Sequence, residues 1–120
     1  MVHFSGYGWP TRCGLSHNAS TTATQVNNFF MLERDIERYL VKRVEALGGK
    51  AYKFVSPGRA GVADRIVCLP NGQTWFVEVK TEGGRLSPLQ KVFAEDMMRL
   101  NQRYVVVWSK EQVDEIWKRL

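Results

Sequence analysis

The chain has 120 residues, a length that fits one compact domain and leaves no room for a second full one. Hydrophobic residues make up 44% of the sequence and charged residues 24%, which excludes a disordered or fibrous protein. No run approaches the roughly 18 to 20 consecutive apolar residues of a membrane span, and the N-terminus lacks the pattern of a secretory signal, so we expect a soluble cytoplasmic protein. Seventeen Lys and Arg against twelve Asp and Glu give a net charge of +5, which favours a polyanionic partner such as nucleic acid.

Residues 1–30 differ in composition from the rest of the chain. Gly, Ser, Thr and Asn dominate this segment, and Arg12 is the only Lys, Arg, Asp or Glu in it. Such a composition predicts a poorly ordered extension, followed by a folded domain over residues 31–120. Met31 directly precedes the first strongly patterned segment, which makes it an alternative start of translation.

From residue 31 onwards the sequence alternates between helical and strand patterns. Ile36, Leu40, Val44 and Leu47 recur at spacings of four and three, the pattern of an amphipathic helix. Short runs rich in β-branched and apolar residues, bounded by Gly, Pro and Asn, predict strands. The predicted elements are a helix over 31–48, strands over 51–56, 64–69 and 74–80, a helix over 87–100, a strand over 104–108 and a helix from 109 to the C-terminus.

Turn and capping residues indicate how these elements connect. The Pro-Asn-Gly turn at residues 70–72 predicts that the second and third strands pair as an antiparallel hairpin. Ser87 is the predicted N-cap of the middle helix, with Pro88 at its first position and Gln90 closing a capping box. The order αβββαβα, with a strand-helix-strand crossover, predicts an α/β fold whose central mixed four-stranded sheet is flanked by helices. The aromatic residues expected in the core are Tyr52, Phe54, Trp75, Phe76 and Phe93.

The strand at 74–80 ends in two charged residues. Alternate side chains of a strand share a face, so Glu78 and Lys80 lie on the same side. The predicted hairpin brings Asp64 close to Glu78, and two neighbouring carboxylates raise the cost of ionising each other. A divalent cation such as Mg²⁺ relieves that cost, binds carboxylate oxygens and bridges to phosphate, so this cluster suggests phosphodiester hydrolysis.

The same residues also have purely structural interpretations. Two charges at alternate strand positions are commonly a solvated edge, and capping alone accounts for Gln90. A serine or cysteine nucleophile is disfavoured, because His3 and His17 lie in the N-terminal segment and no histidine follows them. Cys13 and Cys68 are far apart in sequence and are interpreted as free thiols.

Asp64 followed by Glu78-Val79-Lys80 resembles the Asp then Glu-x-Lys signature of the PD-(D/E)xK nuclease superfamily. Ala63 stands where that pattern often has proline, a departure that touches no metal ligand. The resemblance implies a restriction-endonuclease-like core with divalent metal at its active site.

Three segments together resemble one family of that superfamily, the VRR-NUC family. They are residues 53–64, the Glu-Val-Lys strand at 78–80 and the Leu-Ser-Pro-Leu-Gln run at 86–90. The resemblance covers about residues 32–115. It implies a metal-dependent endonuclease that hydrolyses the phosphodiester backbone of DNA.

The resemblance also implies roles for individual residues. Asp64 and Glu78 are expected to bind Mg²⁺ or Mn²⁺, with Val79 as a further metal contact. Lys80 is expected to position or deprotonate the attacking water. Gln90, at the start of the middle helix, is a candidate to touch a metal-bound water or a DNA phosphate.

The family uses a glutamate on its first helix as well, and here two glutamates stand one turn apart. Helical spacing places Glu33 inside the core-facing arc and Glu37 at its border. We favour Glu37 as the helix carboxylate and further metal ligand, because it stands deeper in the helix and next to Ile36, and keep Glu33 as second choice. The structural alternative is that both are first-turn acids that favour the helix dipole.

Three basic residues are candidates for holding DNA, namely Lys53, Arg59 and Arg85. Small stand-alone proteins that this chain resembles tend to be phage-encoded homodimers that resolve branched DNA such as Holliday junctions. We therefore expect a homodimer, encoded by a phage or bacterium, that acts on branched DNA. The alternative is a non-catalytic DNA-binding module whose acidic cluster is a structural ion-pair network.

Overall fold

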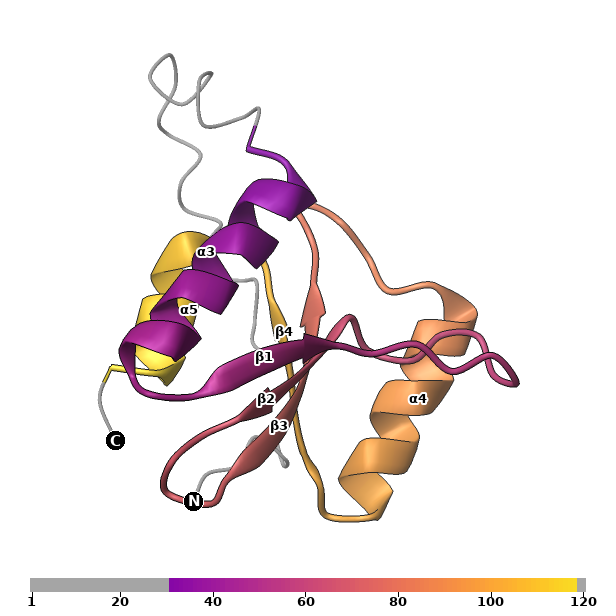
Figure 1. Ribbon diagram of the computed structural model, residues 1–120. Helices are drawn as coiled ribbons and strands as arrows, with labels where there is room; N and C mark the ends of the chain where they lie inside the picture. The colour runs from indigo at the N-terminus through magenta and orange to yellow at the C-terminus, as the bar shows by residue number, and fades with distance from the viewer. Residues whose placement is uncertain (1–30, 119–120) are drawn as a thin grey trace.

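The structure is a computed structural model that describes residues 31–118 (Figure 1). The predictions for residues 1–30, including His3, His17 and Cys13, lie outside the described residues. The elements in chain order are α3 (Glu33–Ala46), β1 (Lys50–Lys53), β2 (Arg65–Cys68), β3 (Thr74–Val79), α4 (Pro88–Arg99), β4 (Arg103–Val107) and α5 (Lys110–Ile116). This confirms the predicted αβββαβα order.

The four strands form one mixed sheet in the order β1-β2-β3-β4. The first three strands pair antiparallel, which confirms the hairpin predicted from the turn at residues 70–72. The last pair, β3 and β4, is parallel, with Val79 opposite Val107, as the crossover through α4 requires.

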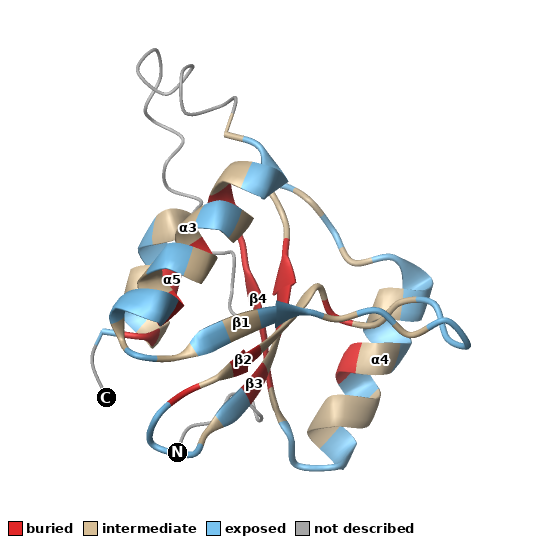
Figure 2. Ribbon diagram, viewed as in Figure 1, coloured by how far each residue is buried: buried red, intermediate tan, exposed pale blue. Residues whose placement is uncertain are grey.

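Helices cover both faces of the sheet (Figure 1). On one face α3 and α5 enclose the larger apolar cluster, and on the other α4 packs over a smaller one (Figure 2). The larger cluster consists of Ile36, Leu40, Val44, Val67, Leu69, Trp75, Val77, Val79, Val105, Val107, Val113 and Trp117. The smaller consists of Ala63, Ala94, Tyr104, Val106 and Trp108, with Phe54, Phe76, Leu86, Phe93 and Met97 packed against it.

The helix starts follow the predicted capping. The Ser87 hydroxyl accepts from the Gln90 backbone N–H at 3.2 Å, and the Gln90 side chain accepts from the Ser87 N–H at 2.8 Å, which completes the predicted capping box. Ser109 caps α5 by accepting from the Gln112 N–H. Within residues 31–118, no helix is both long and apolar enough to cross a membrane.

The first strand is shorter and less buried than predicted. It ends at Lys53 rather than at Ser56, because the chain leaves the sheet toward the Pro-Gly loop and Val55 is 74% exposed. Tyr52 was expected in the core, but its residue is 56% exposed. That prediction is wrong because β1 is an edge strand, while α4 packs against β4 at the opposite edge.

The last helix also ends earlier than predicted. It stops at Ile116, and Trp117 leaves the helical conformation with φ −114° and ψ 63°. Arg43 of α3 then donates to the carbonyl oxygens of Trp117 at 3.0 Å and Lys118 at 2.7 Å. These bonds satisfy two carbonyl groups that follow the end of the helix and have no helical N–H partner. The Trp117 ring packs edge-on against Trp75, with ring centroids 5.6 Å apart.

Candidate active site

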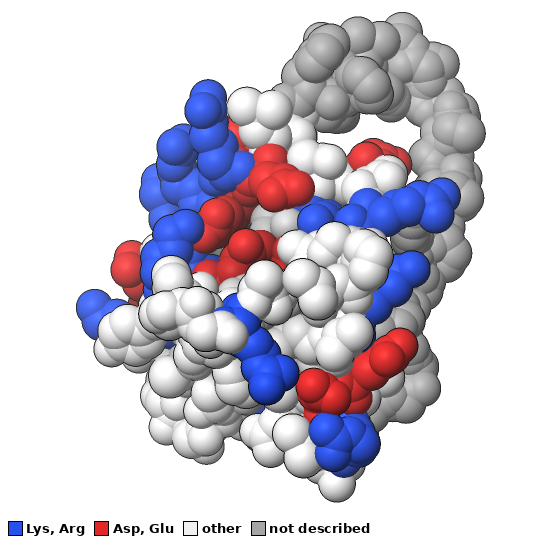
Figure 3. Space-filling model, turned by 90° about the vertical axis from the view of Figure 1, so that its right-hand side faces the viewer, with Lys and Arg blue, Asp and Glu red and all other residues white. Residues whose placement is uncertain are grey.

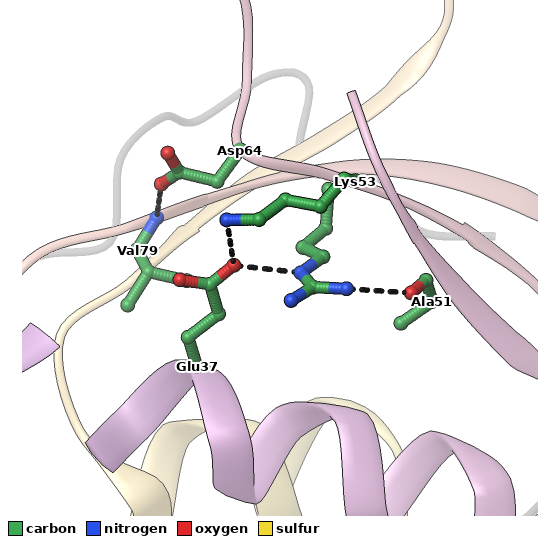
Figure 4. Close-up of polar contacts among 6 residues, drawn as sticks. Glu37, Ala51, Lys53, Asp64 and Val79 are labelled. Carbon is green, nitrogen blue, oxygen red and sulfur yellow. Dashed lines mark hydrogen bonds and ion pairs between the residues drawn. The ribbon is translucent and has the colours of Figure 1, made fainter. Parts of the chain in front are cut away.

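Asp64 lies directly before β2, where the backbone departs from regular pairing. Its N–H donates to the Val77 carbonyl at 3.0 Å, although Val77 is the register partner of Arg65. Asp64 and Arg65 are thus both opposite Val77 of β3, as in a β-bulge. A bulge of this kind changes the direction in which a side chain projects. The Asp64 Oδ2 accepts from the Val79 N–H at 2.8 Å (Figure 4). This bond places the Asp64 carboxylate beside the start of β2 and the C-terminal end of β3.

Glu78 is the one buried charged residue among residues 31–118, with 2% of its surface exposed. Glu78 belongs to β3, and its register partner on the neighbouring strand β4 is Val106. Its side chain lies on the α4 face of the sheet, as does that of Phe76. Its Oε2 accepts from the Gln90 side-chain amide at 3.0 Å and lies 3.8 Å from the Lys80 ammonium. The other oxygen, Oε1, is buried and finds no hydrogen-bond partner in the described part of the chain. An orphaned carboxylate oxygen in the interior is costly unless something binds it.

Burial, the charge of the neighbouring Asp64 carboxylate and the hydrogen bond that protonated Glu78 shares with Asp64 together raise the pKa of Glu78 to about 8, although Lys80 lowers it. The charge of Glu33 acts in the same direction as that of Asp64. Burial and the charges of Glu78 and Asp64 also raise the pKa of the Tyr104 phenol. With both carboxylates ionised, the site would carry more negative charge than Lys80 balances, which is why Glu78 keeps its proton to a higher pH than usual.

These features fit a divalent cation. Two carboxylates close together, one with a free buried oxygen, match the oxygen donors that Mg²⁺ selects, and Mg²⁺ usually takes only one or two carboxylates and keeps several waters. The geometry of residues 31–118 brings no three His, Cys, Asp or Glu side chains close enough to hold an ion by themselves. Water and substrate phosphate would have to complete the coordination.

Gln90 connects the cap of α4 to the site. Its side-chain oxygen accepts from the Ser87 N–H, while its amide nitrogen donates to Glu78. The structural and the functional interpretation of this residue are therefore compatible, because each uses a different atom. By occupying Oε2 of Glu78, Gln90 leaves Oε1 as the free oxygen.

The two glutamates of α3 have different surroundings. Glu37 accepts from Arg65 Nε at 2.6 Å and from Lys53 Nζ at 3.3 Å through the same oxygen (Figure 4). Burial alone would raise the pKa of Glu37, but hydrogen bonds and charges from these two cations lower it overall. Glu33, expected inside the core-facing arc, is instead exposed, and its charge is felt at Glu78. Glu37 is therefore paired with two cations, whereas the charge of Glu33 acts on Glu78.

Arg65 is the residue at this site that sequence patterns did not single out. It follows Asp64 and was interpreted only as part of a strand. The available signal was its alternation with Val67, which puts both side chains on the face that α3 covers. Recognising its partner needed the tertiary contact between β2 and α3.

Basic side chains surround the acidic centre. On the face shown in Figure 3, Asp and Glu gather toward the middle, and Lys and Arg lie on both sides. Lys53 keeps 66% of its side chain exposed although it pairs with Glu37. Arg59 and Arg85 are exposed, on the loops before β2 and before α4. All three candidate DNA contacts are thus accessible to a polyanion.

The fold and the site together define a class of protein. It is a small α/β domain whose mixed sheet carries an aspartate, a buried glutamate and a lysine at the ends of two paired strands. The sequence matches the VRR-NUC domain family over residues 16–111, and the chain belongs to that family. The predicted family is confirmed.

Two relatives agree with this assignment. A protein of Acyrthosiphon pisum secondary endosymbiont phage 1, described as "Putative nuclease p44", is 46% identical over 79 residues, which cover 66% of this chain and 85% of the phage protein. A solved structure described as a VRR_NUC domain superposes with a TM-score of 0.69 at 38% identity, covering 72% of this chain and 94% of that one. The predicted fold is thereby confirmed.

Proposed function

We propose that the protein is a metal-dependent endonuclease that hydrolyses phosphodiester bonds of DNA. The observation that carries the proposal is Glu78, a buried carboxylate with one unpartnered oxygen, beside Asp64 and within 3.8 Å of the Lys80 ammonium. A domain that only bound DNA would gain nothing from burying this charge. The family assignment and the description of the phage relative support the same activity.

Asp64 and Glu78 would hold Mg²⁺ or Mn²⁺, with the backbone carbonyl of Val79 as a further donor. The N–H and C=O of one strand residue point the same way, and the Val79 N–H points to Asp64. For the helix carboxylate we now prefer Glu33 to Glu37. Both cations near α3 already bind Glu37, whereas the charge of Glu33 reaches Glu78.

The bound cation would supply Lewis-acid stabilisation to the phosphate oxygens. Lys80 would hold and orient the attacking water, since its ammonium lies 3.8 Å from Glu78 and its side chain is only 15% exposed. Gln90 would keep the Glu78 carboxylate in one orientation through its 3.0 Å bond. Lys53, Arg59 and Arg85 would contact backbone phosphates on either side.

The proposal extends to the form of the substrate and the assembly. We propose that the protein acts as a homodimer on branched DNA such as a four-way junction. One chain carries one acidic centre among its described residues, so paired cuts on symmetric strands need a second copy. The nuclease-named relative comes from a phage, in keeping with the expected phage or bacterial origin of this protein.

The test is cleavage of labelled four-way junction, flap and linear duplex DNA in Mg²⁺, Mn²⁺ or EDTA. Wild type should cut only with metal, and Asp64→Asn and Lys80→Ala should bind DNA without cutting it. Asp96→Asn, which removes an exposed ion pair on α4, is the matched control and should cut normally. Intact binding with no cutting of any substrate by wild type would establish the binding-module alternative instead. Sedimentation at working concentration reports the oligomeric state.

A further inference from the structure

We propose that Arg65 is a positioning residue, which fixes the first turn of α3, and with it Glu33, relative to the strands that carry Asp64 and Glu78. The inference rests on the proposed function and adds a residue to it. Among the described residues, the hydrogen bonds of the Arg65 side chain go to Glu37 and Ala51 rather than to Asp64 or Glu78. It acts through the helix that carries Glu33.

The contacts of Arg65 join three elements (Figure 4). Its Nε donates to Glu37 Oε2 at 2.6 Å, and its Nη1 donates to the Ala51 carbonyl at 2.8 Å. One side chain from β2 thereby ties helix α3 to strand β1. Only 18% of either side chain in the Arg65–Glu37 pair is exposed, so the bonds are partly shielded from water.

Arg65 gives the first half of helix α3 a directional contact with the sheet, whereas Tyr39 and Arg43 bond the helix to α5 and the residues after it. Ile36, Leu40 and Val44 fix its distance from the sheet, but apolar packing has no direction and resists small rotations weakly. Glu33 and Glu37 are four residues apart and so occupy the same face of the helix. A bond that fixes Glu37 therefore also fixes the direction in which Glu33 projects.

The tether starts from the site itself. Arg65 follows Asp64 in the chain and pairs with Val77, the residue before Glu78. Arg65 thus fixes the orientation of α3 relative to the two strands that carry Asp64 and Glu78. Lys53 reaches the same Glu37 oxygen but is far more exposed, so we expect it to add less.

Lysine cannot reproduce this arrangement. The guanidinium directs separate N–H groups at a carboxylate and at a carbonyl, whereas an ammonium is a single charged point. The variant Arg65→Lys keeps the charge and most of the packing but loses the simultaneous bonds. Arg99→Lys is the matched control, because Arg99 pairs with Asp96 at 3.1 Å on the surface of α4.

The first measurement is Ca²⁺ binding by calorimetry, with Mg²⁺-dependence of cutting alongside. Loss of an outer contact to a metal site weakens metal affinity by about 10- to 100-fold, and we expect the lower end for Arg65→Lys and no change for Arg99→Lys. Hydrogen exchange of the amides in residues 33–37 should accelerate in Arg65→Lys alone. Duplex affinity in EDTA should stay within about twofold of wild type, since phosphate contacts are untouched.

The second measurement separates positioning from general stability. In a Glu33→Gln background, Arg65→Lys should cause little further loss of Ca²⁺ affinity, because the group it positions is already gone. An equal loss in both backgrounds, or unchanged Ca²⁺ affinity in Arg65→Lys, overturns the inference and leaves the nuclease proposal standing. Wild type that neither binds Ca²⁺ nor cuts DNA overturns the proposed function.

Discussion

The two faces of the sheet contrast within a single strand. Trp75, Val77 and Val79 of β3 project into the cluster under α3 and α5, which is apolar throughout. Phe76, Glu78 and, just beyond the strand, Lys80 project toward the α4 side. On this side the aromatic Phe76 is followed, toward the end of the strand, by the buried carboxyl group of Glu78.

The difference shows how a small domain separates stability from chemistry. The α3/α5 face has its Val, Leu and Trp side chains almost fully buried, so it carries most of the apolar stabilisation. The α4 face combines Phe54, Phe76, Phe93 and Tyr104, with ring centroids about 6 Å apart, and leaves the strand ends to polar groups. Changes on the two faces should therefore affect different properties.

The largest expected effect is on cutting. Asp64→Asn and Glu78→Gln keep side-chain shape but remove the charges proposed to bind metal, so the rate should fall by at least about 100-fold. Thermal unfolding should still be cooperative. Rates are compared under single-turnover conditions in saturating Mg²⁺, and a variant that retained a tenth of wild-type activity would contradict the assignment.

The next largest effect is on stability and belongs to the other face. Leu40, on the sheet-facing side of α3, is fully buried, and Leu40→Ala should lower the free energy of unfolding by about 2 to 5 kcal/mol. Urea denaturation measures this, and molecules that remain folded should cut at the wild-type rate. Val92→Ala on α4, half exposed, is the control and should cost about 0.5 kcal/mol or less. Equal losses of unfolding free energy in Leu40→Ala and Val92→Ala would contradict the greater contribution of the α3/α5 face to stability.

A third effect links the polar face to pH in metal-free protein. Below pH 4.5, the ordinary pKa, Glu78 is protonated in folded and unfolded chains alike. Between 4.5 and about 8 only the unfolded chain ionises, so stability falls as pH rises, and the fall stops above the folded pKa. In EDTA the melting temperature of Glu78→Gln should therefore increase relative to that of wild type as the pH rises from 4.5 to about 8. Parallel curves for the two proteins would refute the raised pKa.

The smallest effect dissects the start of α4. Ser87→Ala removes the hydroxyl that caps the helix and should cost about 1 kcal/mol. Gln90→Ala loses the bond to the Ser87 N–H and also the bond to Glu78, so cutting should fall in this variant only. Thermal melts and single-turnover rates of both variants distinguish the two roles. Equal rates in both would show that Gln90 serves only the cap.

Much of the fold was predictable because short-range patterns determine it. The four-residue apolar repeat of α3, the capping box of Ser87 and Gln90, and the turn at 70–72 all depend on neighbours within a few positions. The end of β1 and the exposure of Tyr52 depend instead on which strand forms the edge and on where α4 packs. The early end of α5 depends on Arg43, far away in sequence.

For the site, the sequence by itself determined the residue types and the face they share. Strand alternation puts Glu78 beside Lys80, the hairpin brings Asp64 to them, and all of this is local geometry. Only the tertiary structure decided how the two helix glutamates differ. Helical spacing puts Glu33 and Glu37 on one face of α3, and they differ because Arg65 of β2 binds Glu37, whereas the charge of Glu33 acts on the pKa of Glu78.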